Sequence, residues 1–238
     1  VGLSAHGANR VVTERTRIAM PETGIGFLPD VGGTWLLSRQ ATETGTYLAL
    51  TGEAVGASDA IFIGLADIFI PHEDLPRLIE ALAGLPPGAT QAAVGAVIAG
   101  FGRSVEATPL QAHVATVTRT MGADDVEAIL AALAGDGSPF AAATSQTIAA
   151  KSPTSLKLTL RLLRLGRGSP SLETCLEREF AAAVAMTRGP DFYEGVRAAV
   201  IDKDRNPRWS PATLAEVDPR IVEGFLAPAL EPVFGAVA

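Results

Sequence analysis

Two carboxylate side chains, Glu22 and Asp30, stand in a segment (residues 18–39) that otherwise consists mostly of apolar residues, glycine and proline. The apolar residues around them are Met20, Ile25, Phe27 and Leu28. Because burial disfavours the charged form, a carboxylate among such neighbours has a raised pKa and is suited to proton transfer near neutral pH. The alternative is that both carboxylates bind turn backbone and face water. The segment is therefore the first candidate for an active site.

The elements that must position these carboxylates are short. Pro21 and Pro29 lack a backbone N–H, and four glycines in the same segment make a continuous helix costly. We predict a short strand that ends near Met20, a glycine-rich turn, and a helix that begins around Gly33-Thr34. Both carboxylates would then lie in or beside the connection between a strand and a helix.

Several helix boundaries can be predicted from capping residues. Serines followed by helical apolar spacing indicate helix starts at Ser138, Ser152 and Ser171. Asp124 and Glu127 have the spacing of a capping box. Residues 44–50 predict a helix closed by Gly52, and residues 66–70 predict a buried strand. In the helix that begins after Ser171, apolar residues recur every four positions, which predicts a buried stripe of Leu172, Leu176 and Phe180.

The carboxylate segment resembles a known family. Met20-Pro21-Glu22 followed by Pro29-Asp30-Val31-Gly32-Gly33-Thr34 is similar to the active-site segment of the crotonase (enoyl-CoA hydratase/isomerase) superfamily. The pattern within residues 21–33 is similar, more narrowly, to that of the 3-hydroxyisobutyryl-CoA hydrolases. Residues 151–160 resemble a helix start of the same hydrolases, and residues 188–211 resemble their closing signature. The resemblance therefore extends over most of the chain.

The resemblance implies an α/β fold: the crotonase (ClpP-like) ββα-spiral core, N-terminally incomplete here, with a C-terminal helical region. Residues 1–71 are expected to form the C-terminal part of the core with the active-site segment. Residues 72–238 are expected to form the helical region and a C-terminal extension. The family pattern also implies a glycine-rich turn upstream of Val1 that carries one amide of the oxyanion hole. Trimer-based homo-oligomers are common in the superfamily, so self-association is a further expectation.

The resemblance assigns roles to three residues. Glu22 is the main catalytic carboxylate, Asp30 binds the substrate 3-hydroxyl or assists proton transfer, and Gly2 is expected to help bind the substrate. Attack on a thioester puts negative charge on the carbonyl oxygen, and each backbone N–H aimed at that oxygen stabilises it by about 3–4 kcal/mol. Glu22 can attack the carbonyl to form a mixed anhydride or act as a base on water, and both routes stay open. No metal or redox cofactor is implied, because CoA is part of the substrate.

One departure separates the subfamilies. Hydratases of the superfamily have a second glutamate directly after the glycine-rich turn, where this chain has Gly2. Their addition of water to a double bond uses a pair of carboxylates, so the glycine favours a hydrolase. We therefore predict hydrolysis of a short branched 3-hydroxyacyl-CoA, with 3-hydroxyisobutyryl-CoA, an intermediate of valine breakdown, as the suggested substrate. The alternatives are an enoyl-CoA hydratase or isomerase of the same fold, and a non-catalytic acyl-CoA-binding or assembly subunit.

Composition limits the partners and the compartment. The net charge of −7 argues against nucleic acid as a partner, because phosphate binding needs a basic surface. The single cysteine, Cys175, excludes an internal disulfide and suits a reducing compartment. No apolar run reaches the length of a membrane span, and the first residues do not resemble a signal peptide. We therefore expect no membrane association and a cytoplasmic location.

The remaining polar and aromatic candidates indicate packing rather than chemistry. Metal-ligand spacing is absent from the three histidines, His6, His72 and His113. A solvated helix face, or alternatively contact with CoA phosphates, is expected for Lys157, Arg161 and Arg164. Cys175 is expected to be an inert core residue, and Trp35 and Trp209 are expected to anchor packing.

Overall fold

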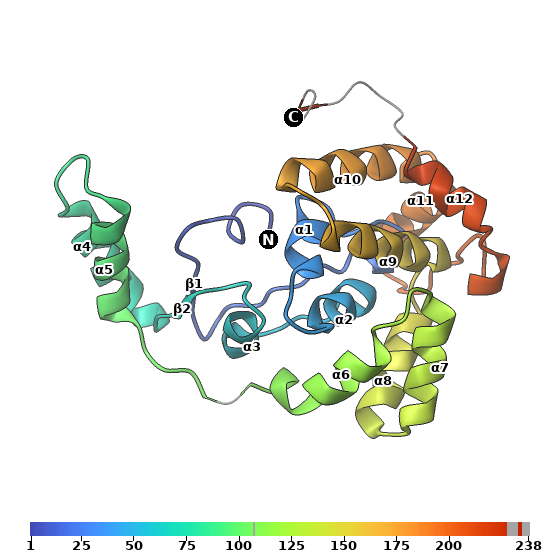
Figure 1. Ribbon diagram of the computed structural model, residues 1–238, viewed down its shortest axis with the longest axis horizontal. Coiled ribbons are helices and arrows are strands. Elements are labelled where there is room, and N and C mark those ends of the chain that lie inside the picture. Colours follow the sequence, from blue (N-terminus) through green and yellow to red (C-terminus); the bar gives the residue numbers. More distant parts are fainter. Residues whose placement is uncertain (107, 228–232, 235–238) are drawn as a thin grey trace. The chain divides into compact units, whose positions relative to one another are not determined.

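The computed structural model describes residues 1–106, 108–227 and 233–234. Internal contacts divide the chain into two units, both drawn in Figure 1. The first comprises Val1, residues 3–18 and residues 54–112. The second comprises Gly2, residues 19–53 and residues 113–238, and it holds both candidate carboxylates. The predicted division at residue 71 concerns the core of the whole family fold, and it stays a prediction.

The first unit contains a two-stranded parallel sheet. Strand β1 (Val11–Val12) pairs with β2 (Ile68–Phe69), which confirms the strand predicted within residues 66–70. The other elements of this unit are α3 (Ala57–Phe62), η2 (His72–Asp74), α4 (Leu75–Ala83) and α5 (Gln91–Phe101), with the turn η3 (Leu110–His113) at its end. Ile70, Leu78 and Ile98 form a buried apolar cluster in this unit, packed against side chains of β1, β2, α4 and α5.

The strand predicted to end near Met20 is mostly absent. The chain forms only a single antiparallel bridge there, between Ile18 and Val55. Pro21 follows closely and cannot donate a ladder hydrogen bond, so the extended segment stops early and turns into a helical element.

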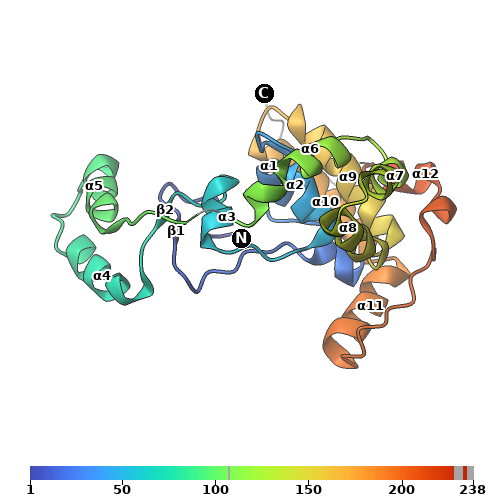
Figure 2. The same ribbon diagram turned by 90° about the horizontal axis from the view of Figure 1, so that it is seen from below.

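The second unit is helical, as Figure 2 shows. In chain order its elements are η1 (Glu22–Ile25), α1 (Gly33–Ser38), α2 (Thr44–Thr51), α6 (Val114–Thr120), α7 (Val126–Asp136), α8 (Pro139–Ala149), α9 (Pro153–Arg167), α10 (Leu172–Met186), α11 (Pro190–Val196), the π-helical turn η4 (Arg197–Ile201), η5 (Leu214–Glu216) and α12 (Pro219–Phe225). Helix α9 packs against α1, α2, α7, α10 and α12. It is therefore the central helix of this unit.

Most of the predicted caps are confirmed. A side chain accepts a hydrogen bond from the backbone N–H three residues later at Ser138, Ser152 and Ser171. Gly52 adopts a left-handed φ of 67° and closes α2. The prediction for α7 is wrong by one residue, because Asp125 rather than Asp124 accepts from the N–H of Ala128.

The basic residues of α9 differ in their surroundings. Arg161 is 45% exposed and pairs with Glu223, as expected for a solvated face, whereas Lys157, which pairs with Glu127, is only 20% exposed. The side chain of Arg164 is only 10% exposed and pairs with Asp124 and Glu43. It also donates to the backbone carbonyls of Met121 and Ala123. The prediction of an exposed face is therefore wrong for Arg164, which joins α9 to the connection between α6 and α7.

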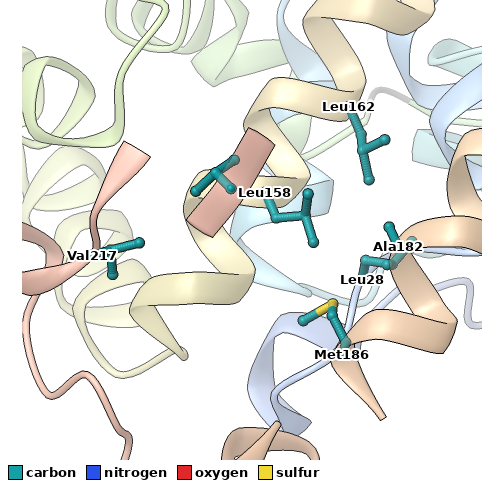
Figure 3. Close-up of a cluster of buried hydrophobic side chains, with 7 residues drawn as sticks. Leu28, Leu158, Leu162, Ala182, Met186 and Val217 are labelled. Carbon is teal, nitrogen blue, oxygen red and sulfur yellow. The ribbon is translucent and has the colours of Figure 1, made fainter. Parts of the chain in front are cut away.

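The core of the second unit also fixes the loop between the two candidate carboxylates. Leu28 lies between Glu22 and Asp30 in the sequence and is fully buried. It belongs to a cluster with Leu158 and Leu162 of α9, Ala182 and Met186 of α10, and Val217 (Figure 3). Burying a leucine side chain contributes about 1.5–3 kcal/mol, so this single residue anchors the loop firmly.

Cys175 is 1% exposed, as expected for a core residue, whereas Trp35 and Trp209 are half-buried. The guanidinium of Arg39 lies 3.3 Å from the ring centre of Trp35, and the indole N–H of Trp209 donates to the carbonyl of Ala150.

Within the described ranges, no three His, Cys, Asp or Glu side chains are grouped so that they could hold a metal ion. No helix of those ranges is long and apolar enough to cross a membrane.

Candidate active site

Glu22 is the first residue of the short helix η1, directly after Pro21. Two neighbouring elements hold this turn through Thr23. Its hydroxyl donates to the carbonyl of Leu50 in α2 at 3.4 Å, and its carbonyl accepts from the N–H of Ser152, the cap of α9, at 3.2 Å. The backbone that carries Glu22 is therefore fixed by helices from distant parts of the sequence.

Gly26 closes η1, and no other residue fits there. Its φ of 69° is in the left-handed region, and a Cβ at this position would lie 2.2 Å from the carbonyl oxygen of Asp191. The side chain of Asp191 in turn accepts from the hydroxyl of Ser152 and the N–H of Ser210. The turn is thus packed against the beginning of α11 without space for a side chain.

The carboxyl group of Glu22 is half-buried, and its Oε2 atom is buried without a hydrogen-bond partner in the part of the chain that the structure describes. Burial, with a smaller contribution from the charge of Asp30, raises the pKa of Glu22 to about 7. A buried polar atom is costly to leave unpaired, so this oxygen is suited to meet a ligand or water. Near neutral pH the group exists both as acid and as carboxylate, which proton transfer requires.

Asp30 lies at the other end of the same loop and is half-buried as well. Burial raises the pKa of its carboxyl group. Because the charge of Asp30 acts on Glu22, the structure brings the two predicted carboxylates within electrostatic reach of each other. Their catalytic roles stay predictions.

Gly2 lies against Val31, the residue that follows Asp30. A Cβ built on Gly2 would lie 2.9 Å from the Cβ of Val31, closer than real Cβ atoms come to other atoms. The Cβ of Val31 is bonded directly to the backbone and cannot turn aside. The structure therefore places Gly2 beside the candidate segment and leaves no room for a glutamate at this position.

A third carboxylate, Glu179 of α10, binds the same segment and was not predicted. It is 2% exposed and accepts hydrogen bonds from the N–H of Gly32 at 2.8 Å and from the N–H of Thr34 at 2.9 Å. The hydroxyl of Thr34 donates a further hydrogen bond to it at 2.5 Å. Glu179 therefore caps the beginning of α1 from a distant helix.

The predicted orientation of α10 is wrong, which explains why Glu179 was overlooked. Phe180, expected in the buried stripe, is 43% exposed. The residues that face inward are instead Cys175, Glu179, Ala182 and Met186. Fourfold apolar spacing favoured the wrong face, because a glutamate among charged neighbours is typical of an exposed position. The only available signal was that Glu179 has helical spacing to a cysteine, an alanine and a methionine.

The arrangement provides two neighbouring acids, both with raised pKa values, on a loop that the core holds rigidly. Such a pair can take a proton from water, return it to a leaving group, or attack an acyl carbon directly.

Comparisons with known proteins agree on one family. The family model described as enoyl-CoA hydratase/isomerase matches residues 1–226. The mitochondrial 3-hydroxyisobutyryl-CoA hydrolase of Gallus gallus is 40% identical, over 96% of this chain and 60% of that protein. The enzyme of the same name from Homo sapiens is also 40% identical, over 91% of this chain and 57% of that protein. The chain thus spans less than two thirds of the length of these relatives.

Two solved structures are similar over most of the chain. One is a carnitinyl-CoA dehydratase from Mycobacterium thermoresistibile, with a TM-score of 0.87 and 39% identity over 95% of this chain and 64% of that one. The other is an enoyl-CoA hydratase from Rhodobacter sphaeroides 2.4.1, with a TM-score of 0.84 and 36% identity over the same shares.

Proposed function

Because the chain belongs to the enoyl-CoA hydratase/isomerase family and has the crotonase fold predicted for it, we propose that it hydrolyses a short branched 3-hydroxyacyl-CoA to the free acid and CoA. The observation that carries this proposal is the carboxylate set. Glu22 has a buried oxygen without a hydrogen-bond partner among the described residues and lies within electrostatic reach of Asp30, while Val31 occupies the space of a second glutamate at Gly2.

The chemistry follows from the state of Glu22. As a carboxylate it removes a proton from water while the water oxygen attacks the thioester carbonyl carbon; the C–S bond then breaks and the proton passes to the CoA sulfur. Alternatively, Glu22 attacks that carbon itself, and the C–S bond breaks to leave a mixed anhydride and the CoA thiolate. Water then hydrolyses the anhydride to the free acid and protonated Glu22, whose proton passes to the thiolate. Asp30 binds the 3-hydroxyl of the substrate or assists the proton transfer. The reaction needs no metal or redox cofactor.

The names of the relatives support the reaction type. The curated relatives of Gallus gallus and Homo sapiens are named as hydrolases of 3-hydroxyisobutyryl-CoA. We propose the same substrate here, which would place the reaction in valine breakdown. We retain the cytoplasm as the expected compartment, and cell fractionation would test it because these relatives are named mitochondrial. Self-association into trimers stays a prediction that sedimentation would test.

A second candidate function is enoyl-CoA hydration or isomerisation, because the two similar solved structures are named as a dehydratase and a hydratase. The contact between Gly2 and Val31 argues against it, since hydration in this superfamily uses a second glutamate at that position. Shared fold does not decide the reaction, because one fold supports many chemistries.

The test is a pair of assays on the protein as its gene encodes it. Release of free thiol is measured with 3-hydroxyisobutyryl-CoA and a panel of other acyl-CoA thioesters, and hydration is measured with crotonyl-CoA. We expect thiol release from the 3-hydroxyacyl thioester and little hydration. Hydration without thiol release would establish the second candidate. Binding of acyl-CoA with neither reaction would indicate a non-catalytic acyl-CoA-binding or assembly subunit.

A further inference from the structure

Glu179 is buried and carries a carboxylate, yet the proposed reaction does not use it. Its two oxygens accept hydrogen bonds from residues 145 and 147 positions earlier in the chain. The donors are the backbone N–H groups of Gly32 and Thr34 and the hydroxyl of Thr34, at 2.5–2.9 Å. A buried carboxylate with several donors at such distances is strongly tied to them. Glu179 therefore holds the backbone of Gly32 and Thr34 in place.

That conformation is strained. Val31 has a φ of 53° and Gly32 a φ of 80°, both in the left-handed region. A β-branched residue such as valine rarely adopts a positive φ, and such strain persists only where the surroundings enforce it. Gly32 precedes α1 and offers no side chain to cap the free N–H groups of that helix. Glu179 supplies the missing cap and stabilises the strained turn.

Asp30 begins this turn, and its carbonyl accepts from the N–H of Gly33 at 2.8 Å. Burial raises the pKa of Glu179, and the charge of Asp30, two residues before Gly32 in the sequence, adds to the effect. We propose that Glu179 is a positioning residue, which holds the amides of Gly32 and Thr34 so that the turn directs Asp30 toward Glu22. The activity test of this proposal rests on the proposed function, whereas the hydrogen-exchange test does not.

The central variant is Glu179→Gln, which keeps the size of the side chain but replaces one accepting oxygen with a donor. Either amide orientation leaves an N–H of the turn facing an NH₂ group or without a partner. A milder variant, Thr34→Val, removes only the hydroxyl donor and keeps the β-branched shape. The matched control is Glu173→Gln, the same chemical change earlier on α10, where the side chain is half-buried.

The activity test compares two thioesters, 3-hydroxyisobutyryl-CoA and isobutyryl-CoA, which lacks the hydroxyl. If Glu179 acts through Asp30, Glu179→Gln lowers kcat/KM at least about tenfold more for the hydroxylated thioester than for the other, the scale of one lost hydrogen bond. Added to Asp30→Asn, it causes little further loss. Thr34→Val gives a smaller loss of the same kind, and Glu173→Gln gives none. The proposal would be overturned if Glu179→Gln lowered kcat/KM equally for both thioesters and if the double variant with Asp30→Asn showed the product of the two single losses.

The structural test is amide hydrogen exchange in peptides that cover residues 28–38. We expect Glu179→Gln to accelerate exchange there while α9 stays protected, and Glu173→Gln to change nothing. Unchanged exchange at the turn would refute the positioning role whatever the activity. If the unaltered protein releases no thiol from either thioester, the proposed function fails, and hydrogen exchange alone decides the role of Glu179.

Discussion

Glu22 and Glu194 are glutamates of the same helical unit, and their surroundings are opposite. Glu22 is half-buried, one of its oxygens has no hydrogen-bond partner in the described part of the chain, and burial raises its pKa to about 7. Glu194 of α11 accepts hydrogen bonds from the side chain of Arg197 and the backbone of Arg208, which lower its pKa to about 2. Both residues lie in segments that resemble family signatures, so the sequence pattern alone gives them similar weight. Their environments differ, which supports the proposed catalytic role of Glu22 and a structural role of Glu194.

The carboxylates around Glu194 form ion pairs with a neighbouring arginine. The guanidinium of Arg197 binds Glu194, Asp202 and Asp204 at 2.7–2.8 Å. The carboxylates of this region are therefore neutralised by ion pairs, whereas no ion pair within the described residues includes Glu22 or Asp30, and the charge of Asp30 raises the pKa of Glu22. The comparison teaches that an acid available for catalysis is recognised by an unsatisfied environment rather than by its position in a motif.

The largest expected effect is on catalysis. Glu22→Gln should lower thiol release at least about a hundredfold, the usual scale for a general acid or base. Glu194→Gln should change it by less than about threefold, because surface ion pairs contribute little. Steady-state assays of both variants with one thioester make the comparison. Equal losses would contradict the distinction between the two regions.

A smaller loss of activity is expected at the second carboxylate. Asp30→Asn keeps the shape and removes the charge, so we expect about a tenfold loss in kcat/KM for 3-hydroxyisobutyryl-CoA. The loss should be smaller for isobutyryl-CoA, which has no hydroxyl to bind. The ratio of kcat/KM for the two thioesters measures this difference, and an unchanged ratio would exclude contact with the hydroxyl.

Stability should respond to Glu22 in the opposite direction from activity. Its folded-state pKa of about 7 lies above the ordinary value of 4.5, so its stabilising contribution is complete below pH 4.5 and is lost as pH rises through 7. Glutamine cannot ionise. Glu22→Gln should therefore raise the free energy of unfolding by about 1–3 kcal/mol at about pH 8, with the gain vanishing toward about pH 5. Urea titrations at both pH values measure it, and a loss of stability at pH 8 would be contrary to the burial of this carboxylate.

The smallest effect is expected at Glu194, with the reverse sign. Its lowered pKa means that its stabilising contribution is present above pH 4.5 and is lost as pH falls through about 2. Glu194→Gln should therefore lower stability slightly at neutral pH, and about 1 M salt should remove most of the difference because the paired side chains are partly exposed. The same urea titrations, repeated in salt, measure this. A salt-independent loss would instead indicate a packing role.

Local signals in the sequence predicted where the helices begin and end. Ser138, Ser152 and Ser171 cap the helices that they were expected to cap, and Gly52 closes α2. These signals are local, because a cap binds backbone only a few residues away. The turn with Glu22 was likewise predicted from prolines and glycines in its immediate neighbourhood.

Contacts between distant segments were not predictable in the same way. Glu179 meets Gly32 across 147 positions, and Arg164 meets Glu43 across 121 positions. Apolar spacing indicates that a helix is amphipathic, but the rotation of the helix onto its neighbours depends on the shapes that face it. A polar residue on the buried face, such as Glu179, therefore looks exposed until its partners are known.

The central claim is that Glu22 is an acid poised near neutral pH. The most direct measurement is a carboxyl-carbon NMR titration of protein labelled at the glutamate side chains, with Glu22→Gln to assign the resonance. We predict one resonance that titrates near pH 7 and is missing from the variant. If the resonance lost in the variant titrates near the ordinary value of 4.5, Glu22 is a solvated side chain and the proposed mechanism is wrong.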